Sequence, residues 1–227
     1  MEQAILTDVQ KKALNVVFDE PKLNDFYLTG GTALSVYYFQ HRISDDLDFF
    51  TANEPDKQFL HIFAERLKTI VGANSYRFEH PYDRNIFLFS IADSELKIEF
   101  TYYPFQQLEA PVIYEGVRVD SLRDIAANKI MALIDRFDPK DFVDLFFILK
   151  QKTLKEILYD MEKKFDFTIE ALTLGSEFAK AQRIEALPKM IKSLTVEELK
   201  IFFAELAKTF REEVLGNNMD FSEGLDK

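Results

Sequence analysis

Two adjacent glycines, Gly30 and Gly31, separate a short apolar strand at residues 26–28 from a helix that begins near Thr32. Glycine has no Cβ, so the chain can turn tightly there and another group can approach the backbone closely. A strand, a tight turn and a helix in direct succession favour a sheet that is covered by helices. The stretch FYLTGGTALSVYYFQ therefore predicts an α/β fold.

Helices and strands are predicted on both sides of this turn. Apolar residues at helical spacing indicate helices, and alternating apolar and polar residues between turn signals indicate strands. We predict helices at 8–19 and 56–71, strands at 46–51 and 112–119, and two or three antiparallel strands within 75–104.

The sequence pattern changes near residue 120. The stretch SLRD at Ser121 matches a capping box, and helical spacing continues from there to about Arg211. We expect an α/β (α+β) chain with a mixed sheet and flanking helices in residues 1–120. A helical domain in residues 121–227 is expected to follow and to complete the cleft of the site described below.

Composition limits the chemistry that this chain can perform. The 227 residues are 47% hydrophobic, which is enough for a substantial core, and they include no cysteine and three histidines. Thiolate catalysis is thereby excluded, and any metal must be bound mainly by oxygen. A net charge of -11 argues against nucleic-acid binding over a broad surface. Without a long apolar run or a signal-peptide pattern, we expect a cytoplasmic protein and no membrane partner.

Two aspartates lie within the predicted strand DLDFFT. Residues two apart in a strand point to the same side, so Asp46 and Asp48 share one face and Leu47 and Phe49 the other. Two neighbouring carboxylates repel each other unless a cation lies between them, and oxygen ligands favour a hard cation such as Mg²⁺ (or Mn²⁺). The pair therefore predicts a metal site, with ordinary loop or edge-strand acids as the alternative.

A third acid follows the same alternation in LKIEFTY, where Lys97, Glu99 and Thr101 share one face. If this strand neighbours the one that carries Asp46 and Asp48, Glu99 is a third catalytic and metal-binding carboxylate. One or two Mg²⁺ ions could then be held against a triphosphate. An exposed strand face with no catalytic role is the alternative for Glu99.

The glycine turn supplies a candidate binding site for phosphate. Free N–H groups at the start of the Thr32 helix can bind an anion, and Gly30 and Gly31 let a phosphate come close. The P-loop template fails because no lysine follows the glycines, and GxGxxG is absent. The DxDxT and EF-hand templates fail at Phe50.

These residues resemble the signature of the AbiEii/AbiGii toxin family of nucleotidyltransferases, within the DNA polymerase β-like superfamily. The resemblance covers roughly residues 25–150 and includes a K-x-(D/E) strand and a later K-x(3)-L-x(2)-R segment followed by K-D-x-x-D-L. The first part of the signature falls on Gly30, Gly31, Thr32, Ala33, Leu34, His41, Arg42, Ser44, Asp46, Asp48, Phe49 and Phe50. The later positions are Lys97, Glu99, Lys129, Leu133, Arg136, Lys140, Asp141, Asp144 and Leu145.

Lys129 lies in the middle of an apolar helical stripe that also holds Ala126 and Leu133. A buried lysine is costly, so we expect its ammonium to meet phosphate at a cleft, with an ion-paired or snorkelling role as the alternative. Asp141 and Asp144, one turn apart, are expected to anchor Lys129, Arg136 or a substrate hydroxyl. Stabilisation of the helix dipole is the other explanation for these two acids.

The expected activity is Mg²⁺-dependent transfer of a nucleoside monophosphate from a nucleoside triphosphate to an acceptor hydroxyl. The resemblance implies tRNA or another RNA end as acceptor, growth arrest as outcome and an antitoxin as partner. A small-molecule acceptor and a non-catalytic nucleotide-binding module are the alternatives. The expected nucleotide-binding residues are Gly30, Gly31, Thr32, Arg42, Ser44 and Lys129, with Arg136, Lys140, Asp141 and Asp144 in support.

Overall fold

The computed structural model describes residues 5–219, so residues 220–227 of the predicted helical region lie outside the described part. The chain divides into two compact units, Met1–Ile125 and Ala126–Lys227. The division falls inside helix α4 (Leu122–Asp135), whereas the sequence predicts a boundary near residue 120.

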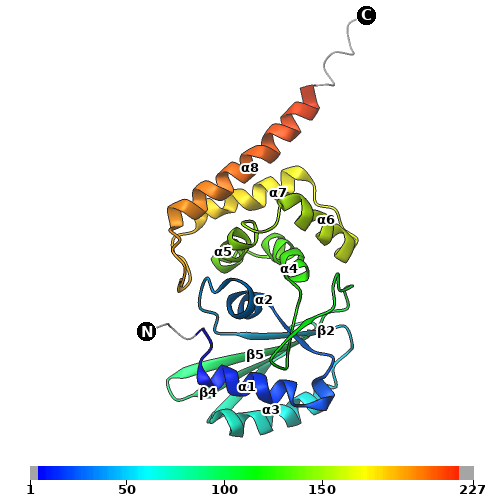
Figure 1. Cartoon of the computed structure of the whole chain (residues 1–227), viewed down its shortest axis with the longest axis vertical. Helices are drawn as coiled ribbons and strands as arrows, with labels where there is room; N and C mark the ends of the chain where they lie inside the picture. The colour runs from blue at the N-terminus through cyan, green and yellow to red at the C-terminus, as the bar shows by residue number, and fades with distance from the viewer. Residues whose placement is uncertain (1–4, 220–227) are drawn as a thin grey trace, which may run out of the picture. The chain divides into compact units, whose positions relative to one another are not determined.

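Within residues 5–219, seven strands form one mixed sheet in the order β3-β4-β5-β2-β1-β7-β6 (Figure 1). Strand β2 pairs antiparallel with β1 and parallel with β5, and β1 pairs parallel with β7. The mixed sheet of the predicted α/β fold is thus confirmed. The strands are β1 (Tyr27–Thr29), β2 (Leu47–Thr51), β3 (Ser75–Glu79), β4 (Arg84–Ile91), β5 (Ser94–Tyr102), β6 (Val112–Tyr114) and β7 (Val117–Val119).

Helices lie on both sides of this sheet. Figure 1 shows α1 (Asp8–Phe18) and α3 (Lys57–Val71) on one side and α2 (Gly30–Ala33) on the other. Helix α2 continues as the π-helical segment η2 (Leu34–Phe39), and the 3₁₀ turn η1 (Pro21–Leu23) follows α1. Thr7 and Asp56 cap α1 and α3 by accepting hydrogen bonds from backbone N–H groups of the first turn.

The core of the first unit is built from the apolar faces of the central strands. Phe49 of β2 and Phe100 of β5 are register partners, and their rings stack with centroids 5.3 Å apart. Phe63 of α3 meets the Phe100 ring edge-on at 6.0 Å. Because side chains alternate along a strand, burying this face directs Asp48 and Glu99 to the opposite face.

Residues 112–119 form a hairpin, so the prediction of a single strand there was wrong. Glu115 and Gly116 both have positive φ, at 49° and 87°, and they reverse the chain between β6 and β7. A two-residue turn of this kind needs positive φ at both positions, and glycine adopts it readily. The glycine therefore divides what reads as one strand into two.

The second unit is helical, as predicted. Phe142, Phe178 and Phe203 build its core, with the Phe142 and Phe203 rings edge-on at 5.1 Å. Figure 1 shows α7 running alongside α8. Its elements after α4 are α5 (Pro139–Ile148), α6 (Leu154–Phe165), α7 (Ala171–Ala179), η3 (Lys180–Arg183) and α8 (Val196–Met219). No helix in the described part of the chain combines the length and the apolar character needed to cross a membrane.

Candidate active site

The sheet brings the glycine turn and the three predicted acids to one place. Strand β2 lies between β1 and β5, so Asp48 is the register partner of Thr29 on one side and of Glu99 on the other. Gly30 follows Thr29 directly, and Asp46 directly precedes β2. The adjacency of β2 and β5, which the sequence leaves open, is thus present in the structure.

A side chain at either glycine of the turn would force its neighbours to shift. Gly30 has a φ of +69°, and a Cβ there would lie 3.0 Å from Oδ2 of Asp48. A Cβ on Gly31 would lie 2.2 Å from Nη2 of Arg42, closer than any packed pair of atoms allows. The carboxylate of Asp48 therefore reaches the turn where the sequence predicts a phosphate.

The residues between the turn and β2 are mostly buried and hold the turn in place. Arg42 is 2% exposed; its guanidinium lies beneath Gly31 and donates to the carbonyl of Ile43 at 3.0 Å. Ser44 Oγ lies 3.2 Å from the same Cβ position of Gly31. The hydroxyl of Thr32 donates to the backbone carbonyl of Asp46, which ties the start of α2 to the start of β2.

Lys97 lies among all three carboxylates. Its Nζ is 3.4 Å from Oδ2 of Asp46, 3.6 Å from Oδ1 of Asp48 and 3.2 Å from Oε2 of Glu99. Burial by itself lowers the pKa of Lys97, but the three negative charges outweigh burial and raise the pKa above its ordinary value. The lysine is therefore a permanent positive charge inside the cluster.

Glu99 is also held by Arg84, a residue that sequence reasoning missed. Nε and Nη2 of Arg84 donate to the two carboxylate oxygens at 2.6 and 2.7 Å, and the hydroxyl of Thr101 donates at 2.7 Å. Burial raises the pKa of Glu99, yet these hydrogen bonds and the charge of Lys97 hold it below its ordinary value. Arg84 opens β4 opposite Thr101, a pairing that only the strand register reveals.

The fit of a divalent cation differs among the three acids. Asp46 and Asp48 have side chains 38% and 26% exposed, and their oxygens suit a hard cation. Glu99 is 4% exposed, and Arg84 already engages both of its oxygens. Within residues 5–219, no group of three or more acidic or histidine side chains is arranged to hold a metal ion. The aspartate pair therefore fits a cation better than the full triad does.

In the second unit, Lys129 is the centre of a buried ion network. Its Nζ lies 2.7 Å from Oδ1 of Asp141 and 2.7 Å from Oδ2 of Asp144, and its side chain is 7% exposed. Arg136 donates to Asp141 at 2.9 Å, whereas Lys140 is exposed. Burial raises the pKa of Asp141, but Lys129 and Arg136 outweigh it and lower the pKa. The two acids thus anchor Lys129; its contact with triphosphate stays a prediction.

Two further contacts support the site and were not predicted. The amide of buried Gln10 in α1 donates to the carbonyls of Ser44 and Asp45 at 2.9 and 3.1 Å. Buried Asp120, at the end of β7, accepts from the hydroxyl of Thr29 at 2.7 Å. Both residues lie far in sequence from the segments they hold, so no local pattern could have identified them.

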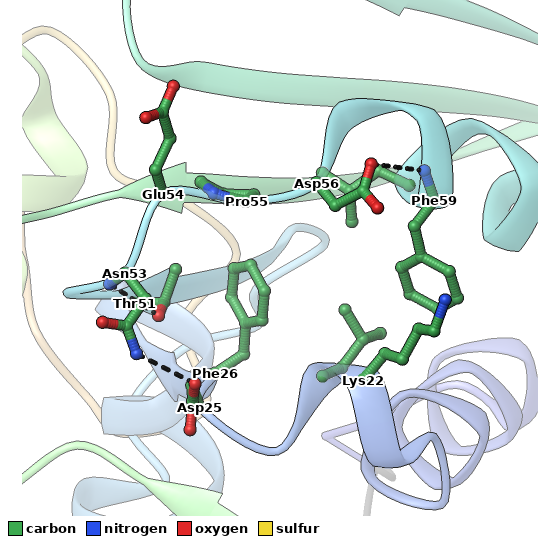
Figure 2. Close-up of a pocket in the computed structure, with 11 residues that line it drawn as sticks. Lys22, Asp25, Phe26, Thr51, Asn53, Glu54, Pro55, Asp56 and Phe59 are labelled. Atoms are coloured by element: carbon green, nitrogen blue, oxygen red, sulfur yellow. Dashed lines mark hydrogen bonds between the residues drawn. The ribbon is translucent and has the colours of Figure 1, made fainter.

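A separate hollow lies at the other end of β2. It has a volume of about 290 Å³, and Figure 2 shows Lys22, Phe26 and Phe59 around it. Asn53 donates to Asp25 across its wall at 2.9 Å. None of Asp46, Asp48 and Glu99 lines this hollow, so it is distinct from the acidic cluster.

Solved structures share the fold of this chain. A candidate nucleotidyltransferase from H. pylori superposes with a TM-score of 0.60 and 20% identity, over 93% of this chain and 98% of that one. MenT4, a nucleotidyltransferase toxin from Mycobacterium tuberculosis H37Rv, gives a TM-score of 0.51 and 11% identity over 90% and 82% of the two chains. The fold of this chain is thus the one seen in these two proteins.

Sequence comparison gives the family. Residues 13–226 match the model of the nucleotidyl transferase AbiEii toxin family, from type IV toxin–antitoxin systems, and the chain belongs to that family. An uncharacterized protein of Aquifex aeolicus (strain VF5) is 35% identical over 167 residues, which is 70% of this chain and 77% of that protein. The resemblance predicted from the sequence is confirmed, and the protein is a nucleotidyltransferase enzyme of a toxin family.

Proposed function

We propose that this enzyme transfers a nucleoside monophosphate from a nucleoside triphosphate to the hydroxyl of an RNA end, with tRNA as the first candidate. The observation that carries the proposal is the carboxylate of Asp48 lying against the Gly30 turn, with Asp46 beside it. This arrangement places cation ligands next to backbone N–H groups that can bind phosphate.

The triphosphate is bound by the turn and by the acids. The N–H groups at the start of α2 bind phosphate oxygens, and Arg42 holds the turn from below. Asp46 and Asp48 would hold Mg²⁺ (or Mn²⁺), which when bound would neutralise charge on the triphosphate. Lys129 would add a second positive charge, although in this structure its ammonium is paired with Asp141 and Asp144.

In the reaction, the acceptor oxygen forms a bond to the α-phosphorus, the bond to pyrophosphate breaks, and the hydroxyl proton leaves to a base or to water. Glu99 is the acid expected to deprotonate or orient the acceptor. Its pKa is held below the ordinary value, which makes it a weak proton acceptor, so the orienting role fits better. Glu99 could join a bound cation only after Arg84 or Lys97 released one of its oxygens.

The family's place in type IV toxin–antitoxin systems supports an antitoxin as the protein that controls the enzyme. RNA as acceptor is what the resemblance implies. MenT4 is likewise named as a nucleotidyltransferase toxin. The net charge of -11 means that an RNA substrate would be bound at a local site rather than over a broad surface. The same charge favours a small-molecule acceptor as the second candidate.

The test is incubation with each labelled nucleoside triphosphate, total tRNA and Mg²⁺ or Mn²⁺. We expect label to pass to RNA with the parent protein and with Asp93→Ala, which changes an exposed acid in the turn between β4 and β5. Asp48→Ala should abolish the transfer. Label on a small hydroxyl compound instead of RNA would support the second candidate, and transfer that survives Asp48→Ala would refute the proposed site.

A further inference from the structure

The position of Lys97 raises a question that the proposed function does not answer. Its ammonium lies within 3.2–3.6 Å of oxygens from Asp46, Asp48 and Glu99, which is the space between the two proposed metal ligands and the third acid. We propose that Lys97 is a resident counter-ion that competes with the divalent cation for these carboxylates. This inference rests on the proposed role of Asp46 and Asp48 as metal ligands.

Strand geometry explains why Lys97 reaches all three acids. Lys97 and Glu99 lie two residues apart on β5 and therefore point to the same side of the sheet. Leu47 is paired with Ile98, so extending that register by one residue places Asp46 opposite Lys97. The long lysine side chain then lies along the line of acids.

The charges of the cluster show what Lys97 does to metal binding. Counted together, the three carboxylates, Lys97 and Arg84 carry one net negative charge. Without Lys97 the net charge would be two negative units, which matches one divalent cation. The ammonium therefore weakens the attraction for a cation and also occupies oxygens that the cation needs.

Arg84 has a different role, although it carries the same charge. Its Nε and Nη2 both donate to Glu99, and its side chain is 41% exposed. It thus fixes the one acid that is least accessible to a cation. Lys97, by contrast, contacts the two more exposed acids, which places it where a metal would displace it.

The experiment measures Mn²⁺ binding to the full chain, without nucleotide or acceptor, by titration calorimetry and by the electron paramagnetic resonance signal of free Mn²⁺. We expect Lys97→Met to bind Mn²⁺ about tenfold more tightly than the parent, because a unit charge a few ångströms away is removed. Lys97→Gln should show the same direction of change, and Lys97→Arg, which keeps the charge, should stay close to the parent.

Two controls separate competition from other effects. Lys68→Met removes one lysine charge from an ion pair with Glu65 on α3 and should leave the affinity unchanged. Adding Asp48→Ala to Lys97→Met should abolish the tight Mn²⁺ binding. That loss would show that the Mn²⁺ is bound at the three acids. Thermal unfolding of each variant shows whether it is folded.

Equal Mn²⁺ affinity in the parent, Lys97→Met and Lys97→Gln would overturn the proposal, as would the absence of Mn²⁺ binding in all of them. The measurement is independent of nucleotide transfer. If affinity rises in Lys97→Met but the parent transfers no label, the proposed reaction fails and the role of Lys97 stands. If the parent transfers label but Lys97→Met binds Mn²⁺ no more tightly, only the role of Lys97 fails.

Discussion

At the scale of single residues, the packing of the site depends on two positions that have no side chain, Gly30 and Gly31. Gly31 leaves room for the guanidinium of Arg42, and Gly30 leaves room for the carboxylate of Asp48. Arg42 was expected to bind nucleotide, and its burial beneath the turn favours a supporting role. The two glycines therefore let the side chains of Asp48 and Arg42 pack directly against the turn.

Gly31→Ala tests this packing. The new Cβ would lie 2.2 Å from Nη2 of Arg42, so the buried guanidinium must shift. We expect a loss of about 1–3 kcal/mol in the free energy of unfolding, as for other overpacked interiors, together with loss of label transfer. Urea unfolding measures the first effect. A variant as stable and as active as the parent would contradict the steric argument.

At the scale of elements, contacts between segments far apart in sequence hold the site in shape. Gln10 of α1 holds the segment before β2, and Asp120 at the end of β7 holds Thr29 before the glycine turn. Asp48 of β2, and Asp46 just before that strand, thus have their positions fixed by neighbours on other elements. Helix α5 similarly holds Lys129 of α4 through two buried acids.

Gln10→Ala should disturb the segment before β2. It leaves the carbonyls of Ser44 and Asp45 without the amide donor and should cost about 2–3 kcal/mol of unfolding free energy. Thr7→Ala is the matched control, because it breaks the same capping box but keeps the Gln10 amide contacts; it should cost about 1 kcal/mol. We expect Mn²⁺ affinity to fall only in Gln10→Ala. Equal Mn²⁺ affinity in the two variants would show that Gln10 serves only as a cap.

Asp141→Asn should reveal the ion network through pH dependence. The pKa of Asp141 in the folded chain lies below its ordinary value of 3.8, so its ionisation stabilises the fold above that pH and the gain is lost as pH falls below it. At neutral pH the variant should be about 3 kcal/mol less stable than the parent. The difference should narrow below about pH 4 in urea unfolding series. A difference in unfolding free energy between parent and variant that stays constant down to pH 3 would contradict the lowered pKa of Asp141.

At the scale of the whole molecule, the proposed functional groups are divided between two units. Asp46, Asp48 and Glu99 belong to the first unit, and Lys129 belongs to the second. The proposed chemistry therefore needs residues of both units, while cation binding needs only the first. A substitution in the helical unit can therefore be tested for its effect on label transfer separately from its effect on Mn²⁺ binding.

Lys129→Met should separate these two contributions. We expect label transfer to fall by at least about tenfold, because the positive charge proposed to contact the triphosphate is lost. Mn²⁺ affinity should stay within about twofold of the parent, since the proposed ligands lie in the other unit. Lys155→Met, at an exposed position of α6, is the control and should change neither quantity. Unchanged transfer in Lys129→Met would remove Lys129 from the proposed site.

Local patterns in the sequence determined the elements and the orientation of their side chains. The alternation in DLDFFT and LKIEFTY directed Asp48 and Glu99 to the face opposite the apolar core, and Gly30 with Gly31 marked the turn from β1 into α2. These features depend on neighbours one to four residues apart, so they can be read from one chain. The hairpin at 112–119 was missed, although Gly116 was its signal.

Only the tertiary structure decided which elements meet. Placing β5 beside β2 brought Lys97 to Asp46 and Asp48, and the register of β4 brought Arg84 to Glu99. Such pairings close long loops of chain and are selected by burial of whole strand faces, a property that no short sequence window contains. The sequence identified the three carboxylates, but it could not show that the ammonium of Lys97 lies between them.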